Sequence, residues 1–264
     1  LYTKSGAIAT FTLNRPAARN ALTPELVCRL ADALRDFVED PALRVGILTG
    51  TGDKAFCSGG DLGTMLPLIS GDRPATDDWD RRVLEEPFVM AASSLRDFPI
   101  DKPLIAAING ACMAGGMEMV LGTDIRIAAD HAVFALPEVR RGVIRFAGSL
   151  VRLARQIPHA VAMELLLTGE AVTAVQAQRF GLVNHVVPND QLLATAVKLA
   201  QDMLELPERI LPRYKQLIDE GFATTLEAGM ALEQEFARDW NNSNTDSVLA
   251  GGGIAQVGAP LELY

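Results

Sequence analysis

The sequence predicts an α/β protein whose first part alternates strands with helices and whose last part is mainly helical. Residues 6–13 alternate apolar and small polar side chains, and residues 104–108 form a short apolar run; both patterns are typical of strands. Residues 23–25, Thr-Pro-Glu, begin a helix, because threonine caps it, proline suits its first position and glutamate suits its dipole. From residue 149 onward, helical spacing dominates.

The remaining elements are predicted on the same grounds. Further strands are expected at residues 44–49, 124–129, 132–135 and 182–187. Further helices are expected at residues 82–98, 150–156, 160–167, 174–180, 191–204, 208–220 and 226–240. Residues 65–86 are polar and carry glycine, proline and several acidic side chains, which indicates a mobile surface insertion.

Composition excludes some classes of protein. The formal net charge of −9 argues against a general nucleic-acid-binding protein, which would present a basic face. It leaves an anionic small ligand open, because a few local basic side chains outweigh a distant average. No apolar run is long enough to cross a membrane, and no targeting segment is visible, so we expect a cytoplasmic protein without membrane contact.

The cysteines and histidines do not form a metal-binding pattern. The cysteines are Cys28, Cys57 and Cys112, and the histidines are His131, His159 and His185. The cysteines are odd in number, widely spaced and set among small or apolar residues, which is typical of buried reduced thiols. No histidine spacing matches a set of zinc ligands, so no metal is expected.

The most informative stretch is residues 103–124, PLIAAINGACMAGGMEMVLGTD. The apolar strand is broken by Asn-Gly, and Gly115 with the next glycine opens a second apolar segment that suits a buried helix. The first N–H groups of a helix have no partner inside it, and without a side chain on Gly115 a substrate oxygen can approach them. Glu118 follows in the first turn. The segment can therefore present an anion hole beside a carboxylate, although a tight turn with a capping charge explains the same residues.

Two further positions allow a similar pair of interpretations. Residues 54–62 place Gly60 and Asp61 directly after a strand and its turn, which exposes backbone N–H groups or simply forms a glycine loop capped by the aspartate. Glu138 lies between Pro137 and Val139 in a largely apolar run. Desolvation there would raise its pKa and suit it to general acid catalysis. A solvated loop glutamate is the alternative.

Taken together, these segments resemble the crotonase superfamily, the enoyl-CoA hydratase and isomerase family. The resemblance covers roughly residues 8–240. The matching segments, in family order, are LNRPAARNAL (13–22), AFCSGGDL (55–62), KPLIAAINGACMAGGMEM (102–119), DIRIAA (124–129), FALPEVRRG (134–142) and LLLTGEAVTAVQAQRFGLVNHVV (165–187), followed by the predicted helices up to residue 240.

The resemblance implies a fold and a site. The fold would be a spiral of repeated ββα units followed by a helical C-terminal region. The backbone N–H groups of Gly60 and Gly115 would hold the thioester oxygen of an acyl-CoA as an oxyanion hole. Glu118 and Glu138 would act as the two glutamates of a hydratase, one activating water and the other exchanging a proton with the α-carbon.

Other implied features concern binding and assembly. The substrate-binding loop would comprise Gly60, Asp61, Leu62 and Gly63, together with Gly115, and Arg15 and Arg19 would contact phosphate or remain solvated at the surface. Coenzyme A would enter only as part of the substrate, with no other cofactor. The regions expected are a spiral core (1–190), a helical trimerisation region (191–240) and a flexible tail (241–264), assembling as a homotrimer or homohexamer.

Two segments depart from the family pattern. Residues 142–148, Gly-Val-Ile-Arg-Phe-Ala-Gly, place Arg145 and Phe146 where the family has a glycine-rich turn, and residues 250–264 contain no lysine or arginine. The departures leave the acyl group open. They also leave open another reaction of the family (isomerisation, dehydration of a hydroxyacyl-CoA or thioester hydrolysis) and a non-catalytic acyl-CoA-binding protein.

Overall fold

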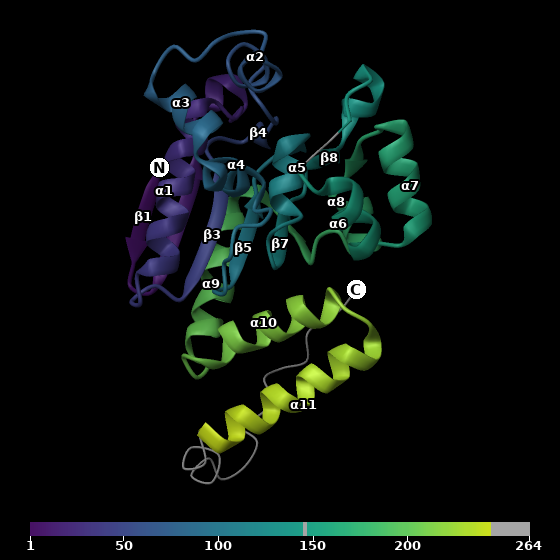
Figure 1. Ribbon diagram of the computed structural model, residues 1–264. Coiled ribbons are helices and arrows are strands. Elements are labelled where there is room, and N and C mark those ends of the chain that lie inside the picture. The colour runs from purple at the N-terminus through teal and green to yellow at the C-terminus, as the bar shows by residue number, and fades with distance from the viewer. Residues whose placement is uncertain (145–146, 244–264) are drawn as a thin grey trace. The chain divides into compact units, whose positions relative to one another are not determined.

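The computed structural model describes residues 1–144 and 147–243 (Figure 1). The chain divides into two compact units, residues 1–211 and residues 212–264. The first unit contains two β-sheets and their covering helices, and the described part of the second contains most of α10 (Ile210–Phe222) and α11 (Leu226–Ser243). The predicted three-part division of the chain stays a prediction. Arg145, Phe146 and the tail from residue 244 lie outside the described residues.

The larger sheet has six strands in the order β1-β2-β3-β5-β7-β10. Their bounds are β1 (Tyr2–Ser5), β2 (Ile8–Leu13), β3 (Val45–Gly50), β5 (Leu104–Ile108), β7 (Ile125–Ala129) and β10 (His185–Val187). All neighbours run parallel except β1 and β2, which form an antiparallel hairpin at the edge. Every residue of β5 is buried, as expected for a strand that is covered on both faces.

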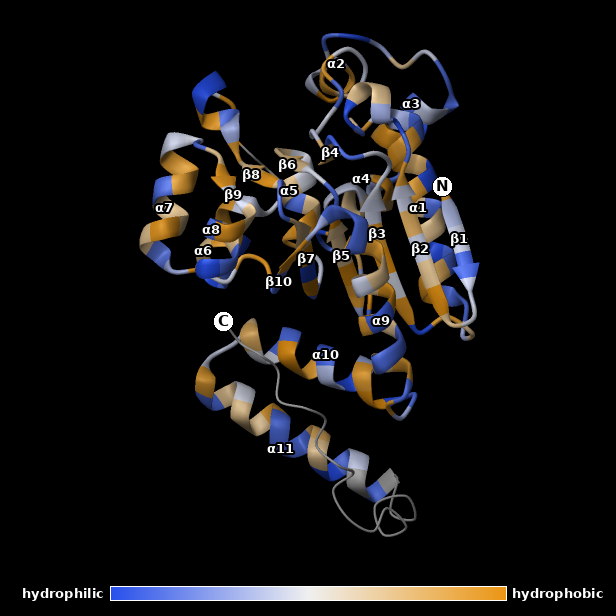
Figure 2. Ribbon diagram, turned by 180° about the vertical axis from the view of Figure 1, so that it is seen from behind, coloured by the Kyte–Doolittle hydropathy of each residue, from blue (hydrophilic) through white to orange (hydrophobic). Residues whose placement is uncertain are grey.

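Helices supply that cover. On one face, α9 (Leu192–Leu204) packs against side chains such as Ile47 and Ile105. On the other, α1 (Pro24–Glu39) contributes to the main core, where the Phe11 and Phe37 rings meet edge to face with centroids 5.6 Å apart. Figure 2 shows the central strands as strongly hydrophobic and the edge strand β1 as hydrophilic. The apolar runs of the sequence are therefore explained by burial between two layers.

The smaller sheet has the order β4-β6-β8-β9, and its first three strands are parallel. Its strands are β4 (Ala55–Cys57), β6 (Ala111–Met113), β8 (Val133–Ala135) and β9 (Val172–Thr173). Each successive repeat adds one strand to each sheet and then turns into a helix: β3 and β4 precede α2 (Met65–Ser70), β5 and β6 precede α5 (Gly115–Val120), and β7 and β8 precede the 3₁₀ turn η2 (Pro137–Arg141). These are the repeated ββα units that were predicted.

The other described helices are α3 (Asp78–Glu85), α4 (Pro87–Ser94), α6 (Ser149–Gln156), α7 (His159–Thr168) and α8 (Ala174–Arg179), with short 3₁₀ turns η1 (Pro16–Ala18) and η3 (Asn189–Gln191). None of the helices in the described ranges combines the length and apolar character needed to span a membrane.

The structure adds detail to residues 65–86 and corrects one prediction about residues 82–98. The segment at residues 65–86, predicted to be a mobile surface insertion, contains α2 and α3, and the Arg73 guanidinium forms a two-bonded ion pair with the buried Asp80 carboxylate at 2.5 and 2.7 Å. The predicted continuous helix at residues 82–98 is broken at Pro87. Proline lacks the N–H that continues a helix and instead begins α4.

Candidate functional site

The predicted site residues follow the carboxyl ends of three adjacent parallel strands. Gly60 lies three residues after β4, Gly115 two residues after β6 and Glu138 three residues after β8. Since β4, β6 and β8 are neighbours in one sheet, their ends meet at one edge, which is where open α/β sheets bind ligands. The Ala114 N–H donates to the Ala135 carbonyl at 3.0 Å, which joins two of these segments directly.

The two glycine segments approach each other closely. A Cβ atom built on Gly59 would lie 2.6 Å from the Ala114 Cβ atom, and Gly59 has a positive φ of 93°, which favours glycine. A Cβ atom built on Gly115 would lie 3.7 Å from the Gly60 nitrogen. Within the described residues, neither the Gly60 nor the Gly115 N–H has an acceptor. The structure thus places two available backbone donors side by side.

The chain enters α5 through a strained residue. Ala114 has φ 52° and ψ −124°, a conformation that side-chain-bearing residues rarely adopt. It is followed at once by Gly115, whose N–H stands at the positive end of the helix, without an intrahelical acceptor. The strain accompanies an exposed donor, as is common where a backbone is shaped for ligand contact.

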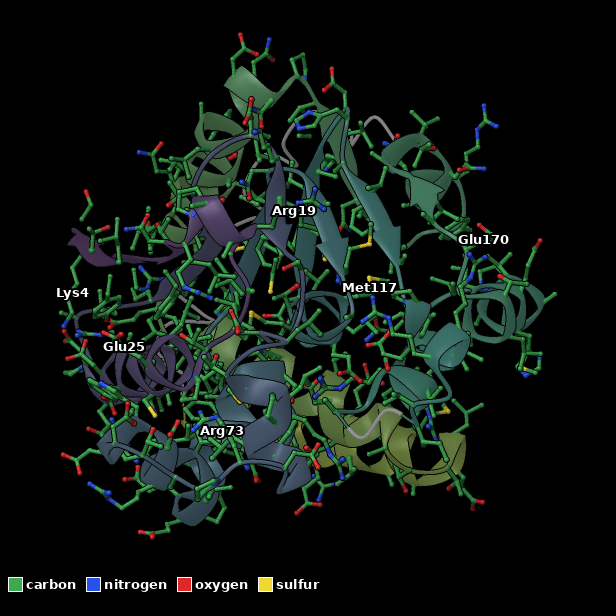
Figure 3. The ribbon with its side chains drawn as sticks, turned by 90° about the horizontal axis from the view of Figure 1, so that it is seen from above. Lys4, Arg19, Glu25, Arg73, Met117 and Glu170 are labelled. Carbon is green, nitrogen blue, oxygen red and sulfur yellow. The ribbon has the colours of Figure 1, made fainter. Side chains whose placement is uncertain are left out.

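Glu118 lies in the first turn of α5 and is only 7% exposed. Its neighbour Met117 is buried, and Figure 3 shows Met117 near the middle of the ribbon, with Glu25 and Glu170 towards opposite edges. The Glu118 Oε1 atom accepts a hydrogen bond of 2.7 Å from the Ser149 hydroxyl, the first residue of α6. The carboxylate is therefore held inside the protein by a partner that the sequence analysis did not identify.

Glu138 lies in η2 and is half-buried, with its Oε2 atom shielded from solvent. Its backbone carbonyl accepts a hydrogen bond of 3.2 Å from the Val143 N–H, which fixes the turn. Close by, Arg140 binds the Thr168 carbonyl and the Glu170 carboxylate, and these contacts tie η2 to the end of α7. Partial desolvation was one of the two interpretations of this glutamate, and the half-buried side chain favours it over a fully solvated one.

The loop from Gly60 to Gly63 is organised by Asp61. Its Oδ1 atom accepts hydrogen bonds from the N–H groups of Gly63 and Thr64, both at 3.0 Å, and its Oδ2 atom accepts one from Arg15. Partial burial opposes the charge, but hydrogen bonds from Arg15 and Thr64 outweigh it and hold the pKa of Asp61 below its ordinary value. Asp61 therefore shapes the loop, while Leu62 is 63% exposed beside it.

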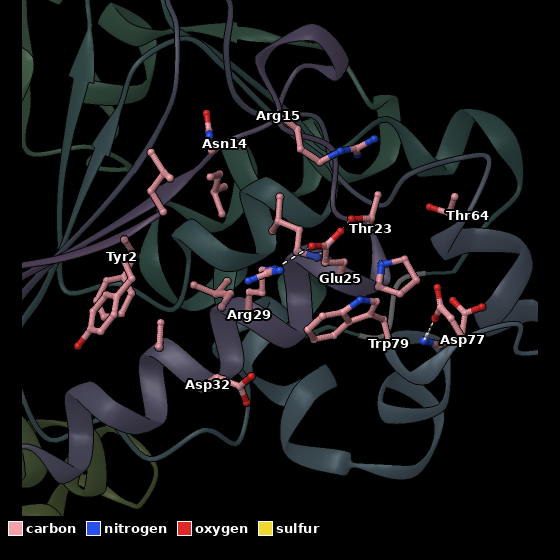
Figure 4. Close-up of a pocket in the computed structure, with 18 of the residues that line it drawn as sticks. Tyr2, Asn14, Arg15, Thr23, Glu25, Arg29, Asp32, Thr64, Asp77 and Trp79 are labelled. Atoms are coloured by element: carbon pink, nitrogen blue, oxygen red, sulfur yellow. Dashed lines mark hydrogen bonds and ion pairs between the residues drawn. The ribbon is translucent and has the colours of Figure 1, made fainter.

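A large groove lies next to this loop but away from the glutamates. Its volume is about 1200 Å³, and it is lined by parts of β1, β2, α1 and residues 63–80. The side chains at its wall include Glu25 and Arg29, which form an ion pair on α1, and Trp79 (Figure 4). Gly63 and Thr64 reach its edge, whereas Glu118, Glu138, Gly60 and Gly115 are not among its lining residues. The candidate site residues therefore lie at the strand ends, outside the lining of this groove.

Among the described residues, no group of three or more His, Cys, Asp or Glu side chains is arranged to hold a metal ion. The exposed side chain of Arg19, which was considered a phosphate contact, belongs to a residue with a positive φ of 52°, and the Arg19 carbonyl accepts a hydrogen bond from the Ser58 N–H. Arg15 is half-buried against Asp61.

Comparison with known proteins identifies the family. The family model described as enoyl-CoA hydratase/isomerase matches residues 3–250. The chain belongs to the enoyl-CoA hydratase/isomerase family. A curated relative of this family member is enoyl-CoA hydratase EchA19 of Mycobacterium tuberculosis, which is 40% identical over 200 residues, covering 76% of this chain and 72% of that protein.

Two further comparisons agree. Mevalonyl-coenzyme A hydratase sidH of Aspergillus fumigatus is 42% identical over 196 residues, covering 73% of this chain and 67% of that protein. The crystal structure of enoyl-CoA hydratase from Bacillus anthracis superposes with a TM-score of 0.78 at 30% identity, covering 90% of this chain and 89% of that one. The crotonase fold and the family predicted from the sequence are confirmed.

Proposed function

We propose that this family member is an enoyl-CoA hydratase, which adds water reversibly across the double bond of an unsaturated acyl-CoA thioester. The observation that carries the proposal is that two backbone donors lie side by side after β4 and β6, while the segments that carry Glu118 and Glu138 follow the adjacent strands β6 and β8. Relatives named as hydratases support hydro-lyase activity on acyl-CoA thioesters.

The two backbone donors would stabilise the charge that develops on the thioester oxygen. As water attacks the β-carbon, the π electrons move toward the α-carbon and the carbonyl, so the oxygen becomes more negative than in the substrate. A Cβ atom built on Gly115 would lie 3.7 Å from the Gly60 nitrogen, which supports the proposal that the two N–H groups share one oxygen. A preformed donor of this kind is typically worth about 3 kcal/mol in the transition state.

The two glutamates would move the protons. One, as a carboxylate, takes a proton from water while the water oxygen bonds to the β-carbon. The other, as a carboxylic acid, delivers a proton to the α-carbon, and the reverse reaction returns both protons. Since addition of water is redox-neutral and both glutamates come from the chain, we propose that no cofactor is needed beyond the coenzyme A of the substrate.

The test replaces each glutamate with its uncharged isostere. Glu118→Gln and Glu138→Gln remove the acid–base group while keeping its size, and each is expected to lower kcat by about 10²- to 10⁴-fold. Turnover is followed by loss of the conjugated enoyl absorbance for short, long, aryl and branched enoyl-CoA thioesters; the branched one is included because one relative is named a mevalonyl-CoA hydratase.

The matched control is Glu164→Gln, an exposed glutamate on α7 that should leave kcat unchanged. Heavy-oxygen water separates the possible reactions, because hydration places the label on a new hydroxyl group, hydrolysis places it on a carboxylate and isomerisation incorporates none. Turnover at the wild-type rate in both glutamine variants would exclude the two-glutamate mechanism. Tight binding of acyl-CoA without turnover would favour the non-catalytic alternative.

We also propose that the protein assembles as a homotrimer or homohexamer in the cytoplasm. Helices α10 and α11 carry large apolar side chains that are mostly solvent-exposed in the single chain. They are Tyr214, Ile218, Phe222, Leu226 and Met230. Exposed apolar groups of this size favour burial against another chain. Sedimentation velocity of the purified protein distinguishes a monomer from either assembly.

A further inference from the structure

Within the described residues, the Glu118 carboxylate accepts its side-chain hydrogen bonds from one residue, Ser149. Ser149 is fully buried, and its hydroxyl donates to the Glu118 Oε1 atom at 2.7 Å, a short distance typical of a bond to a carboxylate. The Ser149 backbone N–H lies 3.5 Å from the same oxygen. Both donors of Ser149 are therefore directed at one atom.

The hydroxyl does not serve its own helix. In many helices a serine near the start caps a free N–H, but α6 begins after Gly148 and, within the described chain, has no side-chain cap. Burying a hydroxyl group costs free energy unless it is hydrogen-bonded, and the one O–H donor of Ser149 is used in the hydrogen bond to Glu118. Capping therefore does not explain why a serine stands at this position.

The two helices that carry the pair are fixed to each other. The Gln156 side chain, at the end of α6, donates to the Leu121 carbonyl at the end of α5 at 3.0 Å. Arg126 binds the Gln156 side chain and the Val120 carbonyl, so it joins the same two helix ends. At the start of α6, Arg152 donates to the carbonyls of Ser94 and Leu95. Ser149 is thus presented to Glu118 from a rigid support.

We propose that Ser149 is a positioning residue for the hydration reaction. By occupying Oε1, its hydroxyl selects one rotamer of Glu118 and leaves Oε2 to exchange the proton with water or substrate. A glutamate side chain has three rotatable bonds, and holding it in the reactive geometry removes an entropic cost from the catalysed step. This inference rests on the proposed function.

The test compares Ser149→Ala with Ser149→Thr. The alanine variant keeps the backbone N–H but loses the hydroxyl, and its kcat is expected to fall about 10- to 100-fold with KM nearly unchanged, because a misplaced catalytic group slows the step without weakening binding. The threonine variant restores a hydroxyl on the same Cβ atom and is expected to recover most of the lost kcat. A purely structural role would not give this split between kcat and KM.

Ser93→Ala is the matched control. Ser93 is also a buried serine, and its hydroxyl donates to the Met90 carbonyl at 2.7 Å on α4. Ser93→Ala and Ser149→Ala should lower the melting temperature by similar amounts, because each removes one buried hydroxyl, but only Ser149→Ala should lower kcat. If Ser149→Ala does not fold, Ser149→Cys replaces it in the test. The thiol has nearly the volume of the hydroxyl group but is a weaker hydrogen-bond donor, so this variant is also expected to have a lower kcat.

A double-mutant cycle shows whether Ser149 acts through Glu118. In the Glu118→Gln background, Ser149→Ala should cause no further loss of kcat, because the group that it positions is already gone. Wild-type kcat in a folded Ser149→Ala protein would overturn this inference alone. Absence of turnover by the wild-type protein on every enoyl-CoA tested would instead overturn the proposed function, and the inference with it.

Discussion

Two adjacent glycines begin α5, and they meet different neighbours. A Cβ atom on Gly115 would lie 3.5 Å or more from every neighbouring atom, which is ordinary van der Waals contact. A Cβ atom on Gly116 would lie 2.6 Å from the Cys57 carbonyl oxygen and 2.7 Å from the Cys57 Cβ atom, both too close. Gly116 is therefore required by packing, whereas Gly115 is required only if something must approach its N–H.

Because of this difference, alanine substitutions at Gly115 and Gly116 should have different effects. Gly115→Ala should fold with nearly unchanged stability but place a methyl group beside the Gly60 N–H, where the thioester oxygen would bind. Blocking one donor of an oxyanion hole is expected to reduce kcat by about 10²- to 10³-fold. Gly116→Ala should instead lower the free energy of unfolding by about 1–3 kcal/mol through overpacking. Urea unfolding and enoyl-CoA turnover of both variants check this; full activity in Gly115→Ala would contradict the hole.

At the residue scale, local pattern was enough for some positions and not for others. Gly115 and Glu118 could be named as candidates because a strand, a turn and a helix start follow one another within a few residues. Ser149 could not, because its partner is 31 residues away and nothing local marks a serine as a donor to a distant carboxylate. The available signal was Gly148-Ser149 opening a helix just after the segment that contains Glu138.

At the scale of elements, α5 ends on a buried arginine. Arg126 of β7 is 6% exposed, and its guanidinium donates to the carbonyls of Val120 and Thr123, at 2.9 and 3.1 Å, and to Leu182 at 3.2 Å. Burial lowers its pKa to about 10. Because the last carbonyls of a helix lack intrahelical partners, this side chain closes the end of the helix whose first turn carries Glu118.

Arg126→Met should therefore destabilise the protein. The Thr123 and Leu182 carbonyls lose this donor, whereas the Val120 carbonyl keeps its bonds from the Thr123 N–H and hydroxyl. Each buried carbonyl left without a donor costs about 1–3 kcal/mol, partly offset because a charge is no longer buried, so we expect a net loss of about 2–4 kcal/mol in the free energy of unfolding. Arg155→Met, an exposed arginine on α6, is the control and should change it by less than about 0.5 kcal/mol. Equal urea midpoints for the two variants would show that Arg126 is not a structural anchor.

Long elements were easier to predict than short ones. The helix α1 begins and ends where its cap, proline and apolar spacing indicate, and β5 matches its apolar run. The three-residue strands β4 and β6 were missed, because three residues carry no periodicity and their pairing is set by the neighbouring strand. The helices α2 and α3 within residues 65–86 were not predicted, and the ion pair between Arg73 and Asp80 in this segment is not revealed by spacing alone.

In the whole molecule, the ββα repeat explains how segments far apart in the chain contribute to one candidate site. Each repeat places its second strand in the smaller sheet, so the residues after those strands gather at one edge. The Leu22–Gly60 bridge adds the first repeat to the same edge. The register between strands, and thus which backbone N–H groups remain available, depends on long-range pairing that the sequence does not display.

The reactivity of the three cysteines can be used to follow local and global unfolding of this fold. All three are free and buried, as predicted, and burial raises the pKa of Cys28 to about 11 and that of Cys57 to about 12. Cys112 of β6 lies opposite Cys57 of β4 in the parallel strand pair, and burial raises the pKa of the Cys112 thiol as well. Since the thiolate is the form that reacts, none of them should react with an aromatic disulfide reagent at pH 8 unless the protein opens.

The cysteines are covered by different parts of the protein, so different opening motions should expose their thiols. The Cys28 thiol donates to the Trp79 carbonyl of α3 at 3.6 Å, so separation of residues 65–86 would expose it, whereas Cys57 and Cys112 lie in the strands that form the core. We expect Cys28 to react first, with a rate that rises weakly with urea, and the strand cysteines to react only with global unfolding and a steep urea dependence. Mass spectrometry of the modified protein assigns each phase. Reaction of Cys57 or Cys112 before Cys28 would mean that the smaller sheet, and the site at its edge, opens more readily than the segment that covers α1.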